Sequence, residues 1–232
     1  MKRTTYGLTA MLVSLLLGMV VTISSLLSMG GRLDSTALTA FSLPTILVSC
    51  LDPLAILLEI AAIVLILLGS RQVGGLHHRL AWAAAILFAI WGIANLGVFI
   101  PLSFLGMQRG SMTLVKAGQF VKAGVALLQY SVPFLLVFSL TRKWSRALLW
   151  LALLLTVIGN FGVVMLTISG IRLEPLEIPG QTMYTPSFDV DYTVGTYPFL
   201  LALGYLGGLL YILVYTLLTW RSWSGVSKGE SS

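Results

Sequence analysis

Two acidic residues, Asp52 and Glu59, lie seven residues apart inside an otherwise apolar segment, Pro44 to Gly69. Seven residues make about two helical turns, so both side chains point in the same direction. An ionisable group inside a bilayer costs at least about 2.5 to 3.5 kcal/mol and therefore normally faces protein or water. A buried carboxylate can also bind a proton, because loss of hydration disfavours its charged form. This pair predicts an ion-binding or proton-binding site.

Asp52 has an alternative role, because Pro53 follows it directly. Asp is a favoured N-cap residue, and Pro is favoured at the first helical position. In that case the helix begins at Asp52, Thr45 to Leu51 forms an irregular or re-entrant entry, and the carboxylate only caps a helix end. The sequence leaves both roles open.

A second polar stripe is formed by Gln119, Lys122 and Gln129, whose spacings of three and seven place them on one helical face. Asp52 and Lys122 both fall in the outer half of their segments. Glu59 and Gln129 fall about 10 Å deeper, at about 1.5 Å of rise per residue. If the two helices touch, Asp52 pairs with Lys122. Glu59 then forms a hydrogen bond with Gln129, which relieves the cost of burying each group alone.

Asn95 and Asn160 lie at a comparable depth and extend this polar layer. One interpretation is that the layer lines a binding site or pathway. The other is that its amides are structural contacts between helices, which contribute only about 0.6 to 2 kcal/mol each in membranes. The candidate substrate-binding or ion-binding residues are Asp52, Glu59, Asn95, Lys122, Gln129 and Asn160.

Composition predicts the fold class. The chain is 57% hydrophobic and 9% charged, with a mean hydropathy of +0.96, too little polar surface for a soluble globule. We expect an all-α, polytopic membrane protein with a single domain over residues 1–232. Its six spans, each near the 20 residues that cross a bilayer, are expected at residues 8–28, 45–69, 80–105, 119–140, 147–169 and 197–220.

The net charge of +6 is mainly a topology signal, because Lys and Arg gather on the cytoplasmic side of short loops. Six spans place both termini on one side, and that side has the larger share of the basic residues: Lys2, Arg3, Arg71, Arg79, Arg142, Lys143, Arg146, Arg221 and Lys228. The opposite side has Arg32, Arg109, Lys116 and Arg172. We therefore expect a cell-membrane protein with both termini, including the tail 221–232, in the cytoplasm. The basic surface indicates lipid contact rather than nucleic-acid binding.

Two outer loops are expected to have structure of their own. Residues 171–196 are long for a connection and rich in Pro, acids and aromatics. We expect an ordered cap there, with the alternating stretch Asp189 to Val194 in a small hairpin. The loop Gly30 to Ser42 is expected to contain a short interfacial helix starting near Asp34 or Ser35.

Helix packing is predicted at Gly204 and Gly208, since small residues four apart let helices approach closely. Tyr211 and Tyr215 follow on the same helix. Pro101 and Pro133 are expected to kink their helices, because proline removes a backbone donor.

Cofactor and catalytic motifs are missing. A single cysteine, Cys50, excludes an internal disulfide, and the adjacent His77 and His78 are expected to be solvated loop residues rather than metal ligands. The chain has no phosphate-binding Gly-rich loop, no hydrolase nucleophile elbow and no zinc-binding His-Glu-x-x-His motif. We expect no cofactor and no metal, and we favour a non-enzymatic function over an enzymatic one.

Two functional hypotheses follow. The first is a protein that translocates an ion or small solute, or a membrane subunit of such a system, with its buried polar layer around Glu59. The alternative is a non-catalytic accessory subunit of a larger membrane complex. The expected partners are the lipid bilayer and other membrane subunits, without nucleic acid. Lipid-facing and partner-facing helices have the same composition, so the sequence does not separate the two hypotheses.

Overall fold

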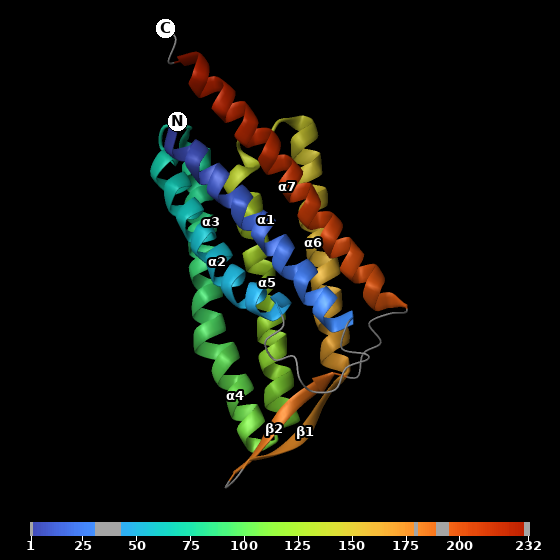
Figure 1. The fold of residues 1–232 in the computed structure, drawn as a ribbon. Helices are drawn as coiled ribbons and strands as arrows, with labels where there is room; N and C mark the ends of the chain where they lie inside the picture. Colours follow the sequence, from blue (N-terminus) through green and yellow to red (C-terminus); the bar gives the residue numbers. More distant parts are fainter. Residues whose placement is uncertain (1, 31–42, 179–180, 189–194, 230–232) are drawn as a thin grey trace. The chain divides into compact units, whose positions relative to one another are not determined.

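The computed structural model describes residues 2–30, 43–178, 181–188 and 195–229 (Figure 1). Six of its helices are long and apolar enough to cross a membrane, which confirms the all-α membrane class. These candidate spans are Lys2–Ile23, Cys50–Ser70, Gly75–Arg109, Met112–Phe138, Lys143–Ser169 and Thr196–Ser224. The interfacial helix predicted near Asp34 and the stretch Asp189 to Val194 lie outside the described residues.

The helices extend beyond the apolar runs that predicted them, because helical structure continues into their polar ends. The fourth span, for example, begins at Met112 rather than at Gln119. The elements in chain order are α1 (Lys2–Gly30), α2 (Leu43–Ser70), α3 (Gly75–Ala94), η2 (Asn95–Phe99), α4 (Ile100–Arg109), α5 (Met112–Phe138), α6 (Lys143–Ser169), β1 (Ile171–Ile178), β2 (Gln181–Phe188) and α7 (Thr196–Gly229).

Helix α2 runs without interruption from Leu43 to Ser70, with Pro53 inside it. Asp52 therefore lies within a helix and is not the N-cap of one, so the alternative role considered for it was wrong. A helix can accommodate an internal proline when neighbouring groups satisfy the freed carbonyl.

The third span changes its helical register at Asn95. Helix α3 passes into a π-helical turn, η2, and then into α4. The backbone N–H of Ile100 donates to the carbonyl of Asn95, five residues earlier. Pro101, which has no N–H, follows at the start of α4. Single π turns inside α-helices are rare and occur frequently at functional sites.

The chain divides into two compact units. Unit 1 comprises Met1–Trp82, Leu135–Leu149 and Gly208–Ser232. Unit 2 comprises Ala83–Phe134 and Trp150–Gly207.

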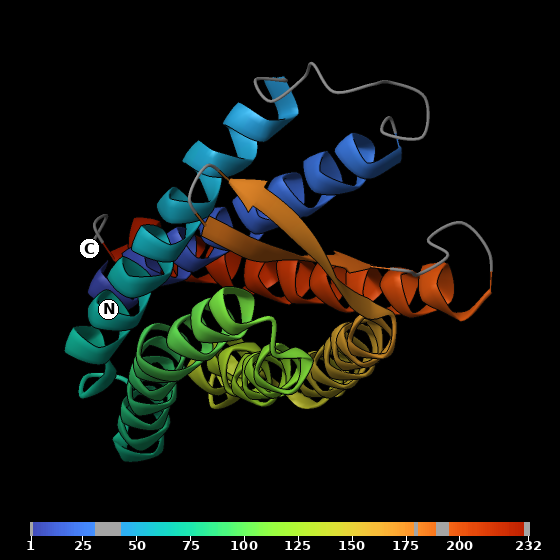
Figure 2. The same ribbon diagram turned by 90° about the horizontal axis from the view of Figure 1, so that it is seen from below.

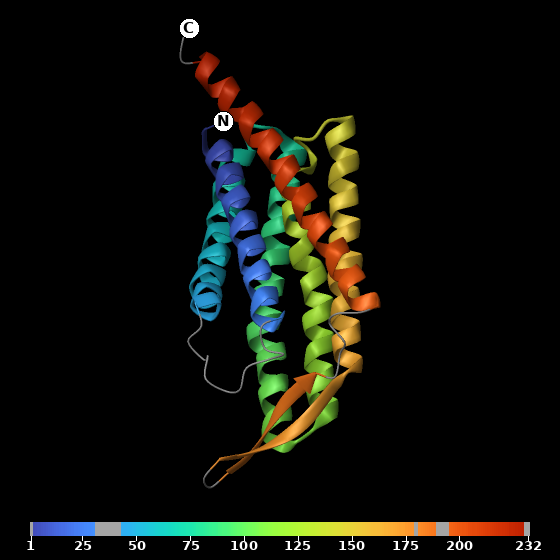
Figure 3. The same cartoon turned by 45° about the vertical axis from the view of Figure 1, so that its right-hand side comes forward.

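In unit 1, α1 and α2 lie side by side and antiparallel (Figures 1 and 3). A Cβ on Gly69 would overlap the hydroxyl oxygen of Thr4. One turn along, a Cβ on Gly7 would lie 2.6 Å from Ile66 Cγ1 and 3.0 Å from its backbone N. Only glycine allows the two helices to approach this closely.

The same pattern recurs in unit 2 between α4 and α5. A Cβ on Gly118 would lie 2.8 Å from Ser103 Oγ, and a Cβ on Gly106 would lie 2.9 Å from the backbone N of Val115. Both helix pairs share one pattern. On the first helix a hydroxyl residue lies three residues before a glycine, as in Thr4 and Gly7 or Ser103 and Gly106, and its hydroxyl faces a glycine of the second helix, Gly69 or Gly118.

The third example joins α6 and α7, also in unit 2. A Cβ on Gly207 would overlap Thr156 Oγ1, and a Cβ on Gly159 would overlap the backbone N of Gly204. In the described part of the chain, the hydroxyls of Thr4, Ser103 and Thr156 are buried and make no hydrogen bond. Each faces a glycine instead, which allows the weak Cα–H···O contact that recurs between helices.

The strands β1 and β2 form an antiparallel hairpin in unit 2, with Ile171 opposite Phe188 and Ile178 opposite Gln181 (Figure 2). A Cβ on Gly110, whose φ of 60° is left-handed, would lie 2.7 Å from the Tyr184 ring. The hairpin thus packs on the turn after α4. It confirms an ordered segment between the last two helices, although its strands precede the stretch predicted to form them.

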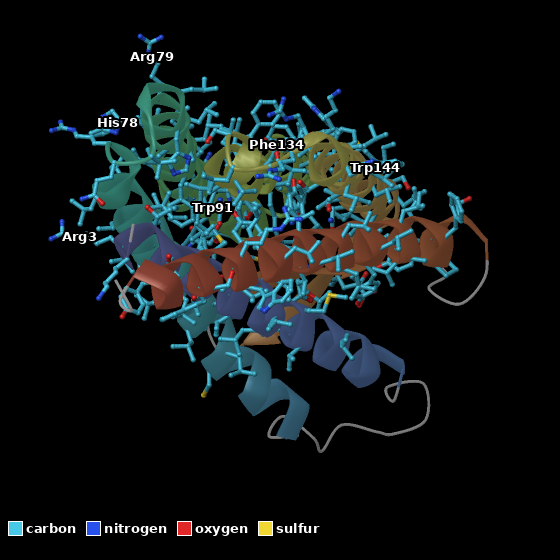
Figure 4. The ribbon with its side chains drawn as sticks, turned by 90° about the horizontal axis from the view of Figure 1, so that it is seen from above. Arg3, His78, Arg79, Trp91, Phe134 and Trp144 are labelled. Atoms are coloured by element: carbon cyan, nitrogen blue, oxygen red, sulfur yellow. The ribbon has the colours of Figure 1, made fainter. Side chains whose placement is uncertain are left out.

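The two ends of the chain meet in unit 1. The rings of Tyr6 on α1 and Trp223 on α7 pack edge to face at 5.5 Å, and Trp223 Nε1 donates to Thr9 Oγ1 at 3.3 Å. The ends therefore lie on one side, as an even number of spans requires. Figure 4 looks onto this end, where Arg3 and Arg79 point away from their helices.

Candidate ion-binding site

Glu59 belongs to the packed face of α2 in unit 1. Ala55, Ala62 and Ile66 are buried on this face, and Glu59 lies among them at spacings of four and three residues. Such spacings keep side chains on the same side of a helix. The Glu59 side chain is 9% exposed, so a carboxyl group occupies a core position within a candidate span.

Helix α1 closes around Glu59 on both sides along the α2 axis. One turn before Glu59, Ser14 Oγ donates to the carbonyl of Ala55 at 2.8 Å. About one turn after it, a Cβ on Gly7 would lie 3.1 Å from the carbonyl oxygen of Ala62. Met11 lies between Gly7 and Ser14 on α1 and is buried. Close contacts between α1 and α2 therefore lie one turn before and one turn after Glu59.

Helix α7 adds two buried phenols to this region of unit 1. Tyr211 and Tyr215 are 2% and 0% exposed. Tyr215 is close enough to both Glu59 and Tyr211 for their charges to interact. A phenol can donate a hydrogen bond to a carboxylate. Glu59 and Tyr215 are thus two buried polar side chains within electrostatic range of each other, and Tyr211 precedes Tyr215 by one turn on α7.

The sequence reasoning left the two tyrosines outside the site. Their spacing of four residues places them on one face of α7, but the same spacing is equally typical of ordinary core residues. The contact with Glu59 depends on how the C-terminal half of α7 packs in unit 1. Periodicity within a single helix carries no information about its neighbours.

The other predicted site residues are divided between the units. Asp52 is exposed and belongs to unit 1. Lys122 and Gln129 belong to unit 2, where Lys122 is exposed and its Nζ lies 5.3 Å from the centre of the Phe99 ring. Pairing of Asp52 with Lys122, and of Glu59 with Gln129, would join the two units and stays a prediction.

The two asparagines of unit 2 each bond to their own helix. Asn95 Nδ2 donates to the carbonyl of Trp91, and Asn160 Nδ2 donates to the carbonyl of Thr156, both at 2.9 Å. A Cβ on Gly204 would lie 3.3 Å from Asn160 Nδ2. These bonds hold the amides against the preceding turn, an arrangement that favours a structural role.

Gly204 and Gly208 lie against different helices. Gly204 meets α6 within unit 2, and its partner on that face is Gly207 rather than Gly208. Gly208 belongs to unit 1, where a Cβ on it would lie 3.7 Å from Met19 Sδ. The closest approach of α6 and α7 therefore uses glycines three apart.

The histidine pair forms a second polar cluster in unit 1. His77 is 1% exposed and its Nδ1 lies 2.8 Å from Ser139 Oγ, so the prediction of a solvated loop pair was wrong for this residue. His78 Nδ1 lies 2.7 Å from Ser70 Oγ. Ser70 already donates its hydroxyl hydrogen to the carbonyl of Leu67, so His78 Nδ1 carries the hydrogen of this bond. The pair ties the start of α3 to the ends of α2 and α5.

Metal ligation has no support in the described ranges, which contain no group of three or more His, Cys, Asp or Glu side chains able to share an ion. The arrangement of Glu59 with its phenols suits the reversible binding of a single charge. Neither a protein-family model, nor a curated protein, nor a solved structure matches this chain.

Proposed function

We propose that this six-helix membrane protein translocates an ion or small solute, alone or as the membrane subunit of a larger system, with Glu59 as its central binding group. The single observation that carries the proposal is the burial of Glu59 inside a candidate span. Ionisable groups are expensive at such positions and generally mark ion or proton pathways.

The chemistry of the cluster supports this function. A buried carboxylate attracts a cation strongly, because few water molecules screen its charge. The neighbouring phenol can stabilise the empty carboxylate through a hydrogen bond, so that the cation can also leave. Both properties are needed for translocation, in which binding must be reversible.

We further propose that both chain ends face the cytoplasm of a cell membrane. Their contact through Tyr6 and Trp223 places them on one side. The surplus of Lys and Arg at that end supports the cytoplasmic side, by the positive-inside rule.

A second function, as an accessory subunit, is favoured by a different observation. Asp52 and Lys122 are both exposed within candidate spans. A charge that faces lipid is costly, and a partner helix of opposite charge would remove that cost. The two functions differ in whether this chain itself carries the site through which an ion or solute passes.

Flux measurements in liposomes separate these functions. Purified wild-type protein should conduct protons or small cations, and Glu59→Gln should lower the rate by at least about tenfold, the effect of losing about 1.4 kcal/mol of binding. Glu174→Gln is the matched control, because it makes the same change at an exposed position on β1 and should leave flux unchanged. Absence of wild-type flux, with a stable partner complex in native membranes, would favour the accessory subunit.

A further inference from the structure

We propose that the contact between His77 and Ser139 is a pH-sensitive link in unit 1. It holds the start of α3 against the end of α5 while His77 is neutral, and it breaks when the imidazole binds a proton. The inference goes beyond the proposed function, because it concerns a conformational change and not the passage of an ion. The hydrogen bonds, the burial and the charges around the histidine pair carry it.

The imidazole of His77 is buried and only partly satisfied. His77 is the third residue of α3, and Ser139 directly follows the last residue of α5. The side chain of His77 is 1% exposed, and its Nδ1 lies 2.8 Å from Ser139 Oγ. The second ring nitrogen, Nε2, is buried and has no hydrogen-bond partner in the described part of the chain. The contact with Ser139 therefore joins the two helices through one ring nitrogen.

This site fits a neutral imidazole and not a charged one. A neutral ring has one N–H and one lone pair, and the Ser139 hydroxyl can serve either of them at Nδ1. A protonated ring has two N–H groups and a positive charge. Its Nε2–H would be a buried, charged donor without an acceptor, which is much more costly than a neutral nitrogen at the same place. The charged ring is therefore expected to move into water and leave Ser139.

The adjacent His78 provides an internal comparison. Its Nδ1–H donates to Ser70 Oγ at 2.7 Å, because the Ser70 hydroxyl hydrogen is already donated to the carbonyl of Leu67. In this tautomer Nε2 has the free lone pair, and the side chain is half-buried rather than buried. A proton that binds at Nε2 leaves the bond to Ser70 in place. Protonation is thus compatible with the contact of His78 and incompatible with that of His77.

The charges at this end of unit 1 do not compensate a charged His77. Among the described residues of the unit only Asp52 and Glu59 are acidic, and Glu230 lies outside the described residues. Glu59 precedes Ser70 by eleven residues on α2, which is about 16 Å of helix rise. The other titratable groups at this end are basic, with one phenol: Lys2, Arg3 and Tyr6 of α1, Arg71 after α2, His78 and Arg79 of α3, Arg142 before α6, Lys143 and Arg146 of α6, and Arg221 and Lys228 of α7. Positive neighbours make a charge on His77 less favourable still.

The turn between α2 and α3 has bonds of its own, so the change should be local. The backbone N–H groups of Val73 and Gly74 donate to the carbonyl of Ser70 at 3.1 and 3.3 Å. Neither bond involves the imidazole of His77. Acid should therefore release the start of α3 from the end of α5 and leave the connection of α3 to α2 intact.

A distance measurement between the two joined segments tests this inference. Spin labels are attached to Leu76→Cys and Trp144→Cys in a Cys50→Ser background, because both positions are exposed and belong to unit 1. Pulsed electron paramagnetic resonance is recorded on the full chain in lipid nanodiscs between about pH 8 and about pH 5, on either side of the ordinary histidine pKa of about 6.5. We expect one short distance at high pH and a growing population at longer distance as the pH falls below about 6.5. The change should be missing in His77→Gln, which binds no proton in this range, and retained in His78→Gln, the matched control.

Three results would overturn the inference: a distance that does not respond to pH, a response that persists in His77→Gln, or a response that is lost in His78→Gln. If His77→Gln does not fold, Ser139→Ala removes the partner and keeps the imidazole. This variant should show more of the longer distance than wild type at high pH, and identical behaviour at every pH would contradict the link. Nitrogen NMR of the His77 ring gives a second readout, in which a charged ring at the short distance would also contradict it. Neither measurement requires transport, so a failure of the proposed function leaves this test unaffected.

Discussion

Gly159 of α6 and Gly204 of α7 bring their backbones into direct contact. A Cβ on Gly159 would overlap the backbone N of Gly204 and would lie 2.5 Å from the carbonyl oxygen of Leu200. The atoms nearest to this Cβ position belong to the backbone of α7, so no flexible side chain could move aside to make room for it. The contact fixes the crossing of the two helices in unit 2, and comparable glycine contacts join α1 to α2 and α4 to α5.

We expect Gly159→Ala to be strongly destabilising. Overpacking a well-packed core typically costs about 1 to 3 kcal/mol, and the helices must separate here to admit a methyl group. Gly92→Ala on α3 is the control, because no atom outside its own stretch of helix backbone lies within 4 Å of its Cβ position. That change should be neutral or stabilising by up to about 1 kcal/mol, the helix preference for Ala over Gly. Thermal unfolding in detergent measures both, and equal effects would contradict the packing.

Two copies of one tetrapeptide on α5 provide a matched comparison. Val115-Lys-Ala-Gly118 and Val121-Lys-Ala-Gly124 have the same sequence, but only Gly118 faces a neighbouring helix, at Ser103. Gly118→Ala should lower stability by about 1 kcal/mol, because the Ser103 hydroxyl must rotate away. Gly124→Ala should raise stability slightly. In a thermal-shift assay, the melting temperature should fall for Gly118→Ala and rise slightly for Gly124→Ala. A lower melting temperature in both variants would contradict this placement of α5.

The buried hydrogen bond from Ser14 to Ala55 is expected to stabilise the α1–α2 pair. Ser14→Ala should lower stability by about 1 kcal/mol, the usual net worth of such a bond. Thr22→Ala on the same helix is the control, because its exposed hydroxyl bonds only to the carbonyl of Gly18 in its own helix. Chemical denaturation of the two variants checks the prediction, which a larger effect at Thr22 would refute.

Membrane topology can be tested with single cysteines in a Cys50→Ser background, since Cys50 is the chain's only cysteine. Arg142 and Glu174 are both exposed, the first before α6 and the second on β1 after it. A membrane-impermeant thiol reagent added outside intact cells should label Glu174→Cys and leave Arg142→Cys unlabelled. The reverse pattern would show that the termini lie outside.

The six spans were predictable because apolar runs of about 20 residues have few other stable structures. The position of Glu59 in an apolar segment also marked it as a candidate from sequence alone. Its neighbours were not predictable, because Tyr215 meets Glu59 only through the packing of α7, some 150 residues later in the chain. Hydrophobic periodicity describes one helix at a time.

Local signals also failed where packing or backbone register decided the outcome. Asp52 and Pro53 have the residue types of a helix start, yet α2 begins at Leu43 and includes both of them. The residues before Asp52 are mostly apolar, so the helix extends through them. The π turn at Asn95 changes the hydrogen-bond register of the helix, and no residue type predicts such a change. The sequence signal near it is Pro101, which lies at the start of α4. His77 has the composition of a loop residue but is buried by its contact with Ser139.

The central claim is that Glu59 and Tyr215 act as one unit in ion translocation. A double-mutant cycle on the initial proton flux tests it most directly, with wild type, Glu59→Gln, Tyr215→Phe and the double variant in liposomes. If Tyr215 acts through Glu59, Tyr215→Phe should slow flux and the double variant should be no slower than Glu59→Gln. Additive effects, or a Tyr215→Phe variant with wild-type flux, would contradict the claim.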